Sequence, residues 1–252
     1  MTDITDTIFR FSHIRAFGRS AMHGLHAVQN DMKQTAAMQK GTAVDAMLYG
    51  TRKVVGCELV RNVKHAAYQE FLAQHPDTEI LTMSDYDKAC RMVEAIRACK
   101  TAEPWLQGVH QETLLFDYNG LRCRTTPDTR GDGFLTELKT THDGSPEKFR
   151  WHALRMAYHA QMWMQGIGCQ SHGFDIKRYM IVCVEANPPH PVTVYEWEPD
   201  ALEMGNRLLT LWTERLRVCM ESKAYPPYSD AIVPLGIPDE MPELVYGDED
   251  NG

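Results

Sequence analysis

Acidic and basic residues whose chemistry suits phosphodiester hydrolysis gather between residues 112 and 161. Asp128 follows Pro127 beside an expected hairpin, and Glu137 and Lys139 stand two apart in an expected strand, so that their side chains share one face. Hydrolysis of a phosphodiester requires charge stabilisation on the phosphoryl oxygens and an activated water, and divalent metals held by carboxylates supply both. These acids and the ammonium could therefore hold a metal ion and a nucleophilic water side by side.

The elements that must position these residues form a mixed α/β pattern after Trp105. Asn119-Gly120 is a strong hairpin signal, and Ser145-Pro146-Glu147 has the residue types that start a helix, which we expect to continue to Gly166. The predicted strands cover residues 111–117, 121–126, 134–140, 178–185 and 192–198, and a closing helix covers 199–222.

The first hundred residues have mostly helical spacing. We expect helical stretches over residues 8–50, 62–75 and 85–100, with Ser84 as the cap of the third. The sequence thus predicts one domain over residues 1–238, with a helical lead-in (1–104) and a catalytic core (105–222). An acidic tail follows over residues 239–252 and is expected to be partly disordered.

The composition excludes several classes of protein. The chain has 252 residues, of which 43% are hydrophobic and 24% charged, a balance unlike that of disordered, collagen-like or fibrous proteins. It has no apolar stretch near the roughly 20 residues of a membrane helix, and its acidic start is unlike a signal peptide. We therefore expect a soluble cytoplasmic protein without membrane contacts. The net charge of −8 argues against generic polyanion binding, although a nuclease can confine basic groups to a groove.

An ordered set of motifs resembles the PD-(D/E)xK nuclease superfamily, and within it the nuclease domain of RecE (exonuclease VIII) and related phage recombination exonucleases. Pro127-Asp128 and Glu137-x-Lys139 match the two namesake motifs, and Glu112 matches the upstream glutamate. Tyr158-x-x-Gln161 looks like the helix motif of these nucleases, and Gly41–Leu48 looks like a further segment in which the family has histidine and this chain has Asp45.

This resemblance implies a restriction-endonuclease-like core, in which a central mixed sheet is flanked by helices, and a Mg²⁺-dependent deoxyribonuclease that also accepts Mn²⁺. It implies a 5′-to-3′ exonuclease on linear double-stranded DNA ends, with a single-strand annealing protein as partner and a ring-shaped homo-oligomer. The implied metal ligands are Glu112, Asp128, Glu137 and the carbonyl of Leu138, joined by Asp45, while Lys139 orients or deprotonates the attacking water. Contacts to DNA are expected from Tyr158, Gln161, Arg15 and Arg19.

Other interpretations stay open at this point. An endonuclease of the same superfamily would nick closed circular DNA, and a catalytically silent DNA-binding or assembly protein would cleave none. Among single residues, Asp128 could be a turn residue, Glu112 a surface strand residue and Asp45 a helix cap, while Asp132 between two glycines reads as a turn acid.

Overall fold

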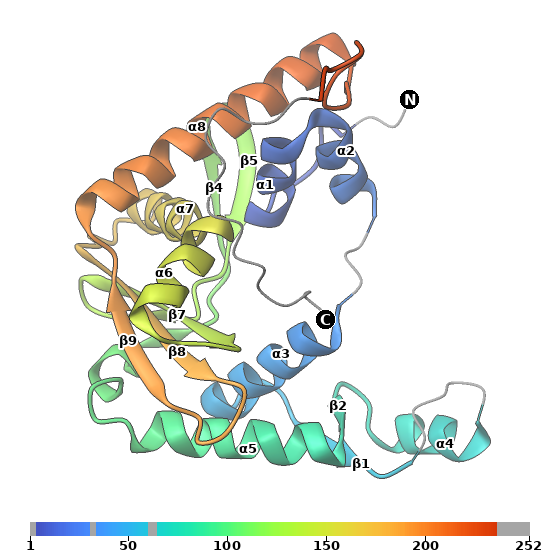
Figure 1. Cartoon of the computed structure of the whole chain (residues 1–252), viewed down its shortest axis with the longest axis vertical. Helices are drawn as coiled ribbons and strands as arrows, with labels where there is room; N and C mark the ends of the chain where they lie inside the picture. Colours follow the sequence, from blue (N-terminus) through green and yellow to red (C-terminus); the bar gives the residue numbers. More distant parts are fainter. Residues whose placement is uncertain (1–3, 31–33, 60–64, 236–252) are drawn as a thin grey trace.

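A mixed five-stranded sheet forms the centre of the protein. The structure is a computed structural model that describes residues 4–30, 34–59 and 65–235 (Figure 1). The strand order is β3–β6–β7–β8–β9, in which β7 and β8 run parallel and the other neighbours run antiparallel. The strands are β3 (Val109–His110), β6 (Thr129–Arg130), β7 (Phe134–Thr141), β8 (Arg178–Glu185) and β9 (Val192–Glu196). This confirms the predicted α/β class with a central mixed sheet flanked by helices.

Helices cover both faces of the sheet. The helices on one face are α3 (Ala36–Tyr49) and α5 (Met83–Ala98), and those on the other are α6 (Pro146–Arg155) and α7 (Tyr158–Ser171). Leu138 and Val182 are buried against the first pair, whereas Leu135 and Ile181 are buried against the second. Since β8 is covered on both sides, its sequence is a nearly continuous apolar run.

The hairpin expected at Asn119-Gly120 is present but lies outside the central sheet. It joins β4 (Leu114–Tyr118) to β5 (Leu121–Thr125), and its two turn residues have φ values of +49° and +74°. Such positive values are those that Asn-Gly hairpin turns require. The buried Phe116 and Cys123 pack in one core cluster with α1 (Phe11–Arg19), α7 and α8 (Pro199–Ser222).

The lead-in is mostly helical, as expected, but two of its features were not predicted. The stretch 8–50 is divided into α1, α2 (Ala21–Gln29) and α3, and the strands β1 (Val54–Cys57) and β2 (Glu79–Thr82) pair in parallel between α3 and α5. Ser20 divides α1 from α2 because its side chain accepts a hydrogen bond from the His23 N–H and caps the second helix.

The remaining elements of the lead-in are α4 (Ala66–Gln74) and the short helix η1 (Glu103–Leu106). Thr82, rather than the expected Ser84, caps α5 by accepting a hydrogen bond from the Asp85 N–H. As a result the lead-in has two separate parts, with α1 and α2 beside α8 and with α3 and α5 below the sheet in Figure 1.

The helix expected from residue 146 to Gly166 is two helices. The break falls at Ala157, whose φ of +56° is left-handed and incompatible with a continuous helix, so that α7 starts in a new direction at Tyr158. No glycine or proline marks this position, so the local sequence carries no signal for the break. The break matters because it sets the direction of the helix that carries Tyr158 and Gln161.

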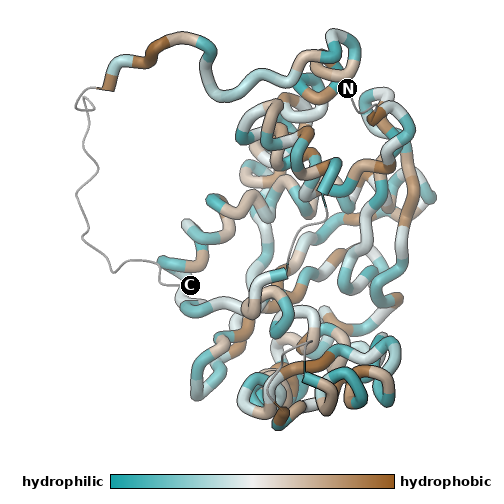
Figure 2. Tube along the Cα trace, turned by 90° about the vertical axis from the view of Figure 1, so that its right-hand side faces the viewer, coloured by the Kyte–Doolittle hydropathy of each residue, from teal (hydrophilic) through white to brown (hydrophobic). Residues whose placement is uncertain are grey.

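The hydropathy of the chain fits this layered fold. In Figure 2 hydrophobic and hydrophilic residues alternate along most of the trace, and the last described segment ends in a hydrophobic stretch that contains the exposed Ile232 and Leu235. In the described ranges, we find no helix with the length and apolar content to span a membrane. The acidic tail over 239–252, and residues 62–64 of the expected second helical stretch, lie outside the described residues.

Candidate active site at the end of strand β7

Glu137 and Lys139 form an ion pair on one face of β7, in which the acid is buried and the lysine is half-buried. The Lys139 Nζ lies 2.5 Å from the Glu137 Oε2, and the side chain of Glu137 is only 3% exposed. Two glutamines of α7 hold the same carboxylate, because Gln161 Nε2 donates to Oε2 at 2.9 Å and Gln165 Nε2 donates to Oε1 at 2.5 Å. Both oxygens of Glu137 are therefore fixed in place by donors from two elements.

Asp128 reaches this pair from the segment between β5 and β6. Its Oδ2 accepts a hydrogen bond of 2.8 Å from the backbone N–H of Leu138, the residue between Glu137 and Lys139. Burial raises the pKa of Asp128 well above its usual value, and the neighbouring charges of Glu137 and Asp45 raise it further. The antiparallel pairing of β6 with β7 is what returns Asp128 to the strand that carries the ion pair.

Asp45 approaches from α3. Gly41, one helical turn earlier, lies so close to β7 that a Cβ at this position would be 3.3 Å from the Thr140 Oγ1. The pKa of Asp45 is raised from 3.8 to about 7. Burial is the largest cause, the charge of Lys139 lowers the pKa, and the charge of Glu137 raises it. The structure thus brings the residue at the family's histidine position within electrostatic reach of Glu137, Asp128 and Lys139.

The charges of this cluster do not balance. Three carboxylates, those of Asp45, Asp128 and Glu137, surround one ammonium, so two negative charges are uncompensated when all groups are ionised. Burial alone would lower the pKa of Lys139, but Glu137 and Asp128 raise it overall, so the lysine is charged. A divalent cation would compensate the remaining charge, and carboxylate oxygens are the ligands that Mg²⁺ prefers.

The carboxylates are spread rather than closed around one point. Among the residues that the structure describes, no three His, Cys, Asp or Glu side chains are grouped at metal-ligand spacing. Asp128 and Glu137 instead accept hydrogen bonds from the chain itself. The number and chemistry of the acids fit a divalent metal ion. To bind it, Asp128 and Glu137 would have to exchange some of these hydrogen bonds for contacts with the metal.

Tyr158 and Arg15 border the cluster. The Lys139 Nζ lies 4.8 Å from the centre of the Tyr158 ring, and the Tyr158 hydroxyl lies 3.5 Å from the His152 Nε2. Burial raises the pKa of Tyr158, whereas the charges of Lys139 and Arg15 lower it. Arg15 reaches this place from α1, where its guanidinium contacts the sulfur of Met156 at 3.6 Å. The first part of the lead-in therefore contributes a cation beside the site.

Two of the predicted site residues lie elsewhere. Glu112 forms an ion pair of 2.6 Å with Arg130 and is 42% exposed, so the structure does not bring its carboxylate to the other three. Arg19 is exposed and donates a hydrogen bond of 2.5 Å to the Tyr228 hydroxyl. Both residues are therefore engaged by partners away from Lys139.

Gln165 and Tyr49 belong to the site but were not predicted. Gln165 is one turn after Gln161 on the same face of α7, and Tyr49 is one turn after Asp45 on α3, so helical spacing was the signal that could have found both. The Tyr49 hydroxyl accepts a hydrogen bond of 3.1 Å from Thr129. Burial and the charge of Asp128 raise the pKa of Tyr49, so it is protonated beneath the carboxylates.

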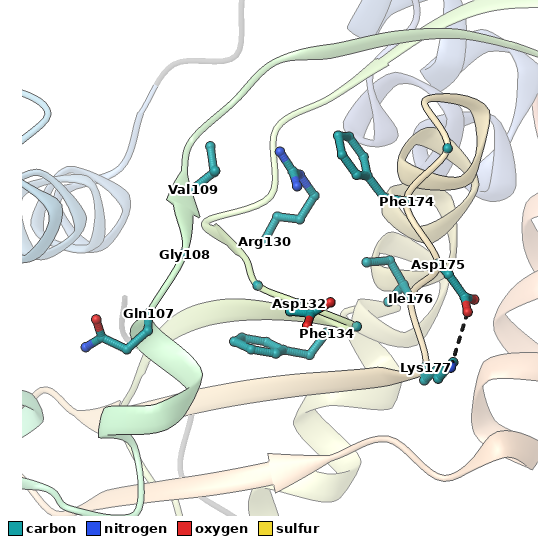
Figure 3. Close-up of a pocket in the computed structure, with 13 residues that line it drawn as sticks. Gln107, Gly108, Val109, Arg130, Asp132, Phe134, Phe174, Asp175, Ile176 and Lys177 are labelled. Carbon is teal, nitrogen blue, oxygen red and sulfur yellow. Dashed lines mark ion pairs between the residues drawn. The ribbon is translucent and has the colours of Figure 1, made fainter.

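An open cavity of about 790 Å³ lies at the other end of β7 and contains none of these site residues. Figure 3 shows its lining, with the Arg130 side chain extending toward Phe174 and the ion pair of Asp175 and Lys177 at its edge. The guanidinium of Arg130 lies 3.6 Å from the centre of the Phe174 ring. Cavity volume therefore does not mark the place where the acids gather.

The arrangement of acids and lysine on β7 agrees with what the sequence is similar to. Residues 10–233 match the family described as a PDDEXK-like domain of unknown function (DUF3799). The chain belongs to this family. The resemblance to PD-(D/E)xK nucleases is thereby confirmed, and the PDDEXK-like domain spans both parts of the lead-in as well as the sheet. Nucleases of this type generally use divalent metals.

Solved structures align with this chain at low sequence identity. A proposed exonuclease from Eubacterium rectale aligns with a TM-score of 0.64 and 13% identity, over 92% of this chain and 91% of that chain. The alkaline exonuclease LHK-Exo from Laribacter hongkongensis aligns over 72% of this chain and 89% of that chain, at 15% identity and a TM-score of 0.33. No protein with a curated description matches the sequence. The first of these likenesses supports the fold alone.

Proposed function

We propose that this protein is a metal-dependent deoxyribonuclease that hydrolyses phosphodiesters beside Lys139. The observation that carries the proposal is the gathering of three carboxylates, those of the buried Glu137 and the half-buried Asp45 and Asp128, around a single lysine, on the elements that the PD-(D/E)xK motifs occupy. Burial of uncompensated charge costs folding free energy, so a cluster of this kind is most simply explained by a bound cation and the chemistry it supports.

The residues that would hold the metal are Asp128, Glu137 and the carbonyl of Leu138, with Asp45 in contact directly or through water. We propose Mg²⁺ as the ion, because all of these donors are oxygen atoms, and Mn²⁺ as a substitute. The bound ion would stabilise charge on the phosphoryl group and lower the pKa of water.

The chain's own groups then have separate tasks. The ammonium of Lys139 would orient the attacking water and stabilise the negative charge that develops on the phosphoryl oxygens. Gln161 and Gln165 keep the Glu137 carboxylate in place through their hydrogen bonds to its two oxygens. Tyr158 lies beneath the ammonium and limits where it can move.

We further propose an exonuclease that degrades linear double-stranded DNA from the 5′ end, of the type used in phage or prophage recombination. This part rests on the resemblance to RecE-type nucleases, and the Eubacterium rectale protein of the same fold is described as a proposed exonuclease. A single-strand annealing protein as partner and a ring-shaped homo-oligomer belong to the same proposal. Arg15, beside Tyr158, is the cation best placed to contact a phosphate at the DNA end.

The decisive experiment compares linear and closed circular duplexes of the same sequence. We expect the linear duplex to lose acid-insoluble nucleotides with Mg²⁺ and not with EDTA, while the closed circle stays intact. Lys139→Ala serves as the control for a contaminating nuclease. Nicking of the closed circle would establish an endonuclease instead, and no metal-dependent loss from either substrate would overturn the proposal.

Strand polarity has its own test. Duplexes that are labelled at one 5′ or one 3′ end should release the 5′ label first, and a 5′ phosphate should accelerate the release relative to a 5′ hydroxyl. Release of the 3′ label first would reverse the proposed polarity while leaving the nuclease assignment in place.

A further inference from the structure

Helix α6 is firmly held on one face and presents an exposed tryptophan on the other. Phe149 and Ala153 are buried with Ile181 of the sheet, and the Phe149 ring stacks on Tyr195 with centroids 4.8 Å apart. Trp151 is two residues beyond Phe149, about 200° around the helix, and 70% of it is exposed. The anchored face therefore fixes where the indole stands.

The same helix connects Trp151 to the catalytic cluster. Its next residue, His152, lies 3.5 Å from the Tyr158 hydroxyl, and the Tyr158 ring lies beneath Lys139. Figure 1 shows α6 in front of the sheet, over β7 and β8 and beside α7. Trp151 is therefore linked to the reacting groups through its neighbour His152 and through Tyr158.

Two basic residues lie between Trp151 and the site-facing side of α6. Lys148 and Arg155 are three residues before and four residues after Trp151, so all three side chains form one exposed stripe along the helix. Lys148 also forms an ion pair of 3.1 Å with Asp143, but the lysine in this pair is 76% exposed, and such surface pairs contribute little. Both cations are thus available to an anionic ligand.

A flat aromatic ring beside a row of cations has the chemistry of a site for a nucleic acid strand. Bases stack on aromatic side chains, and lysine and arginine neutralise the phosphates that follow. An indole that is 70% exposed contributes little to folding, since most of its large apolar surface remains in water. The chain offers this combination next to the cluster that would cleave the strand.

We propose that Trp151 stacks on the unpaired or terminal base at the DNA end, while Lys148 and Arg155 contact the phosphates leading from that base to Lys139. The site would take a DNA end of any sequence, because every base has a stacking face. This inference rests on the proposed nuclease function, to which it adds the element that recognises the end of the substrate.

The test uses duplexes that carry 2-aminopurine either at the last base pair or ten pairs inside. In the Lys139→Ala background, which prevents cleavage, binding should change the fluorescence of the terminal probe and leave the internal probe unchanged. Trp151→Ala should abolish the terminal change and weaken binding of DNA ends by about tenfold, the contribution of one stacked base. Trp151→Phe should restore most of the terminal fluorescence change and most of the affinity for DNA ends. Leu211→Ala, which truncates a comparably exposed apolar residue (52%) on α8, is the matched control and should bind as the parent does.

The basic residues have a second readout. The slope of the logarithm of the binding constant for DNA ends against the logarithm of salt concentration counts the phosphate contacts. Lys148→Ala and Arg155→Ala should each reduce this slope by about one, whereas Arg207→Ala on α8 should leave it unchanged. Unchanged salt dependence in both α6 variants would remove them from the DNA path.

The outcomes separate this inference from the proposed function. If the wild type cleaves linear DNA and Trp151→Ala shows the same terminal fluorescence change and affinity, the stacking site is overturned and the nuclease stands. If Trp151→Phe fails to restore the signal that Trp151→Ala loses, base stacking is overturned in favour of another role of the indole, such as contact with a protein partner. If the wild type cleaves nothing but the Trp151-dependent signal persists, the stacking site stands without the nuclease.

Discussion

Two acid–base pairs, Glu137–Lys139 on β7 and Glu112–Arg130 beside β6, have similar distances and similarly half-buried cations but differ in the surroundings of their acids. Glu137 and Lys139 are 2.5 Å apart, and Glu112 and Arg130 are 2.6 Å apart. The Glu137 side chain is 3% exposed and shares its surroundings with Asp45 and Asp128, whereas Glu112 is 42% exposed and its charge is balanced by Arg130 alone.

This comparison shows what distinguishes a site from a surface contact. Both acids belong to motifs of the same family resemblance, so residue type and order could not separate them. An exposed, balanced pair is worth little free energy either way, while a buried cluster with excess negative charge is costly unless something compensates it. Uncompensated negative charge is therefore the feature that makes this part of β7 the candidate site.

The largest expected effect is loss of cleavage when the cluster around Lys139 is disrupted. Lys139→Ala and Asp128→Ala should each lower the cleavage rate by more than about a thousandfold, because the first removes the cation beside the reacting phosphate and the second removes a proposed ligand of the metal ion. Affinity for DNA, measured by fluorescence anisotropy, should change little. Arg130→Ala is the matched control from the exposed pair and should keep activity within about fivefold. Activity of both the Lys139→Ala and the Asp128→Ala variant within tenfold of wild type would remove the assignment.

The next effect concerns the metal requirement and Asp45. Asp45→Asn keeps the shape but removes the charge, so it should raise the Mg²⁺ concentration for half-maximal activity by about tenfold or more. Asp45→His should retain activity and shift the preference toward Mn²⁺, since imidazole suits transition metals better. Metal titrations of the three proteins provide the comparison. An Asp45→Asn enzyme with the Mg²⁺ titration of the wild type would show that Asp45 lies outside the site.

A smaller effect should appear in stability without metal. Since burial raises the pKa of Asp45 from 3.8 to about 7, the folded protein binds more protons than the unfolded chain between these values. The free energy of unfolding therefore falls as the pH rises through this window, and the penalty is largest above pH 7. In EDTA at pH 8, Asp45→Asn should be more stable than wild type by on the order of 1 kcal/mol, or about 2–4 °C in Tm.

The control for this measurement is pH itself. At pH 5 the difference in unfolding temperature should be smaller than at pH 8, because Asp45 is then protonated in the fold and only the part of the window between 3.8 and 5 destabilises the wild type. Saturating Mg²⁺ should reverse the difference at pH 8 by stabilising the wild type through binding. The exposed Asp132, replaced by asparagine, should alter neither temperature. A wild type as stable as Asp45→Asn at pH 8 in EDTA would contradict the excess charge inferred here.

Most of the sheet could be predicted from the sequence because its strands carry local signals. The bounds of β7 and β8 follow from apolar runs and from the glycine turn before Phe134, and the hairpin follows from Asn119-Gly120. The break at Ala157 could not be predicted, since no glycine or proline marks it, whereas the break at Ser20 was missed although serine is a common helix cap. Two-residue strands such as β6 also cannot be predicted from the sequence, because so short a segment has no hydrophobic periodicity.

The site was predictable in part for a related reason. Spacing along one strand suffices for Glu137 and Lys139, and the motif order supplied Asp128 and Asp45. Whether a carboxylate is buried or paired at the surface depends on residues distant in the chain, as Arg130 shows for Glu112. Gln165 was missed because an amide on a helix has no chemistry of its own until it faces Glu137.

The smallest expected effect comes from the exposed acid. Glu112→Ala removes only the ion pair with Arg130, so activity should remain within about threefold of wild type and stability within about 1 kcal/mol. Glu137→Ala, its counterpart in the buried pair, should abolish cleavage. Steady-state cleavage rates at saturating Mg²⁺ provide the measurement, and Glu112→Gln separates loss of charge from loss of side-chain volume. If Glu112→Gln instead lost activity as Glu137→Ala does, the Arg130 ion pair would have to open during catalysis. The upstream glutamate would then be a metal ligand, as the family resemblance implies, and the contrast between the two pairs would fail.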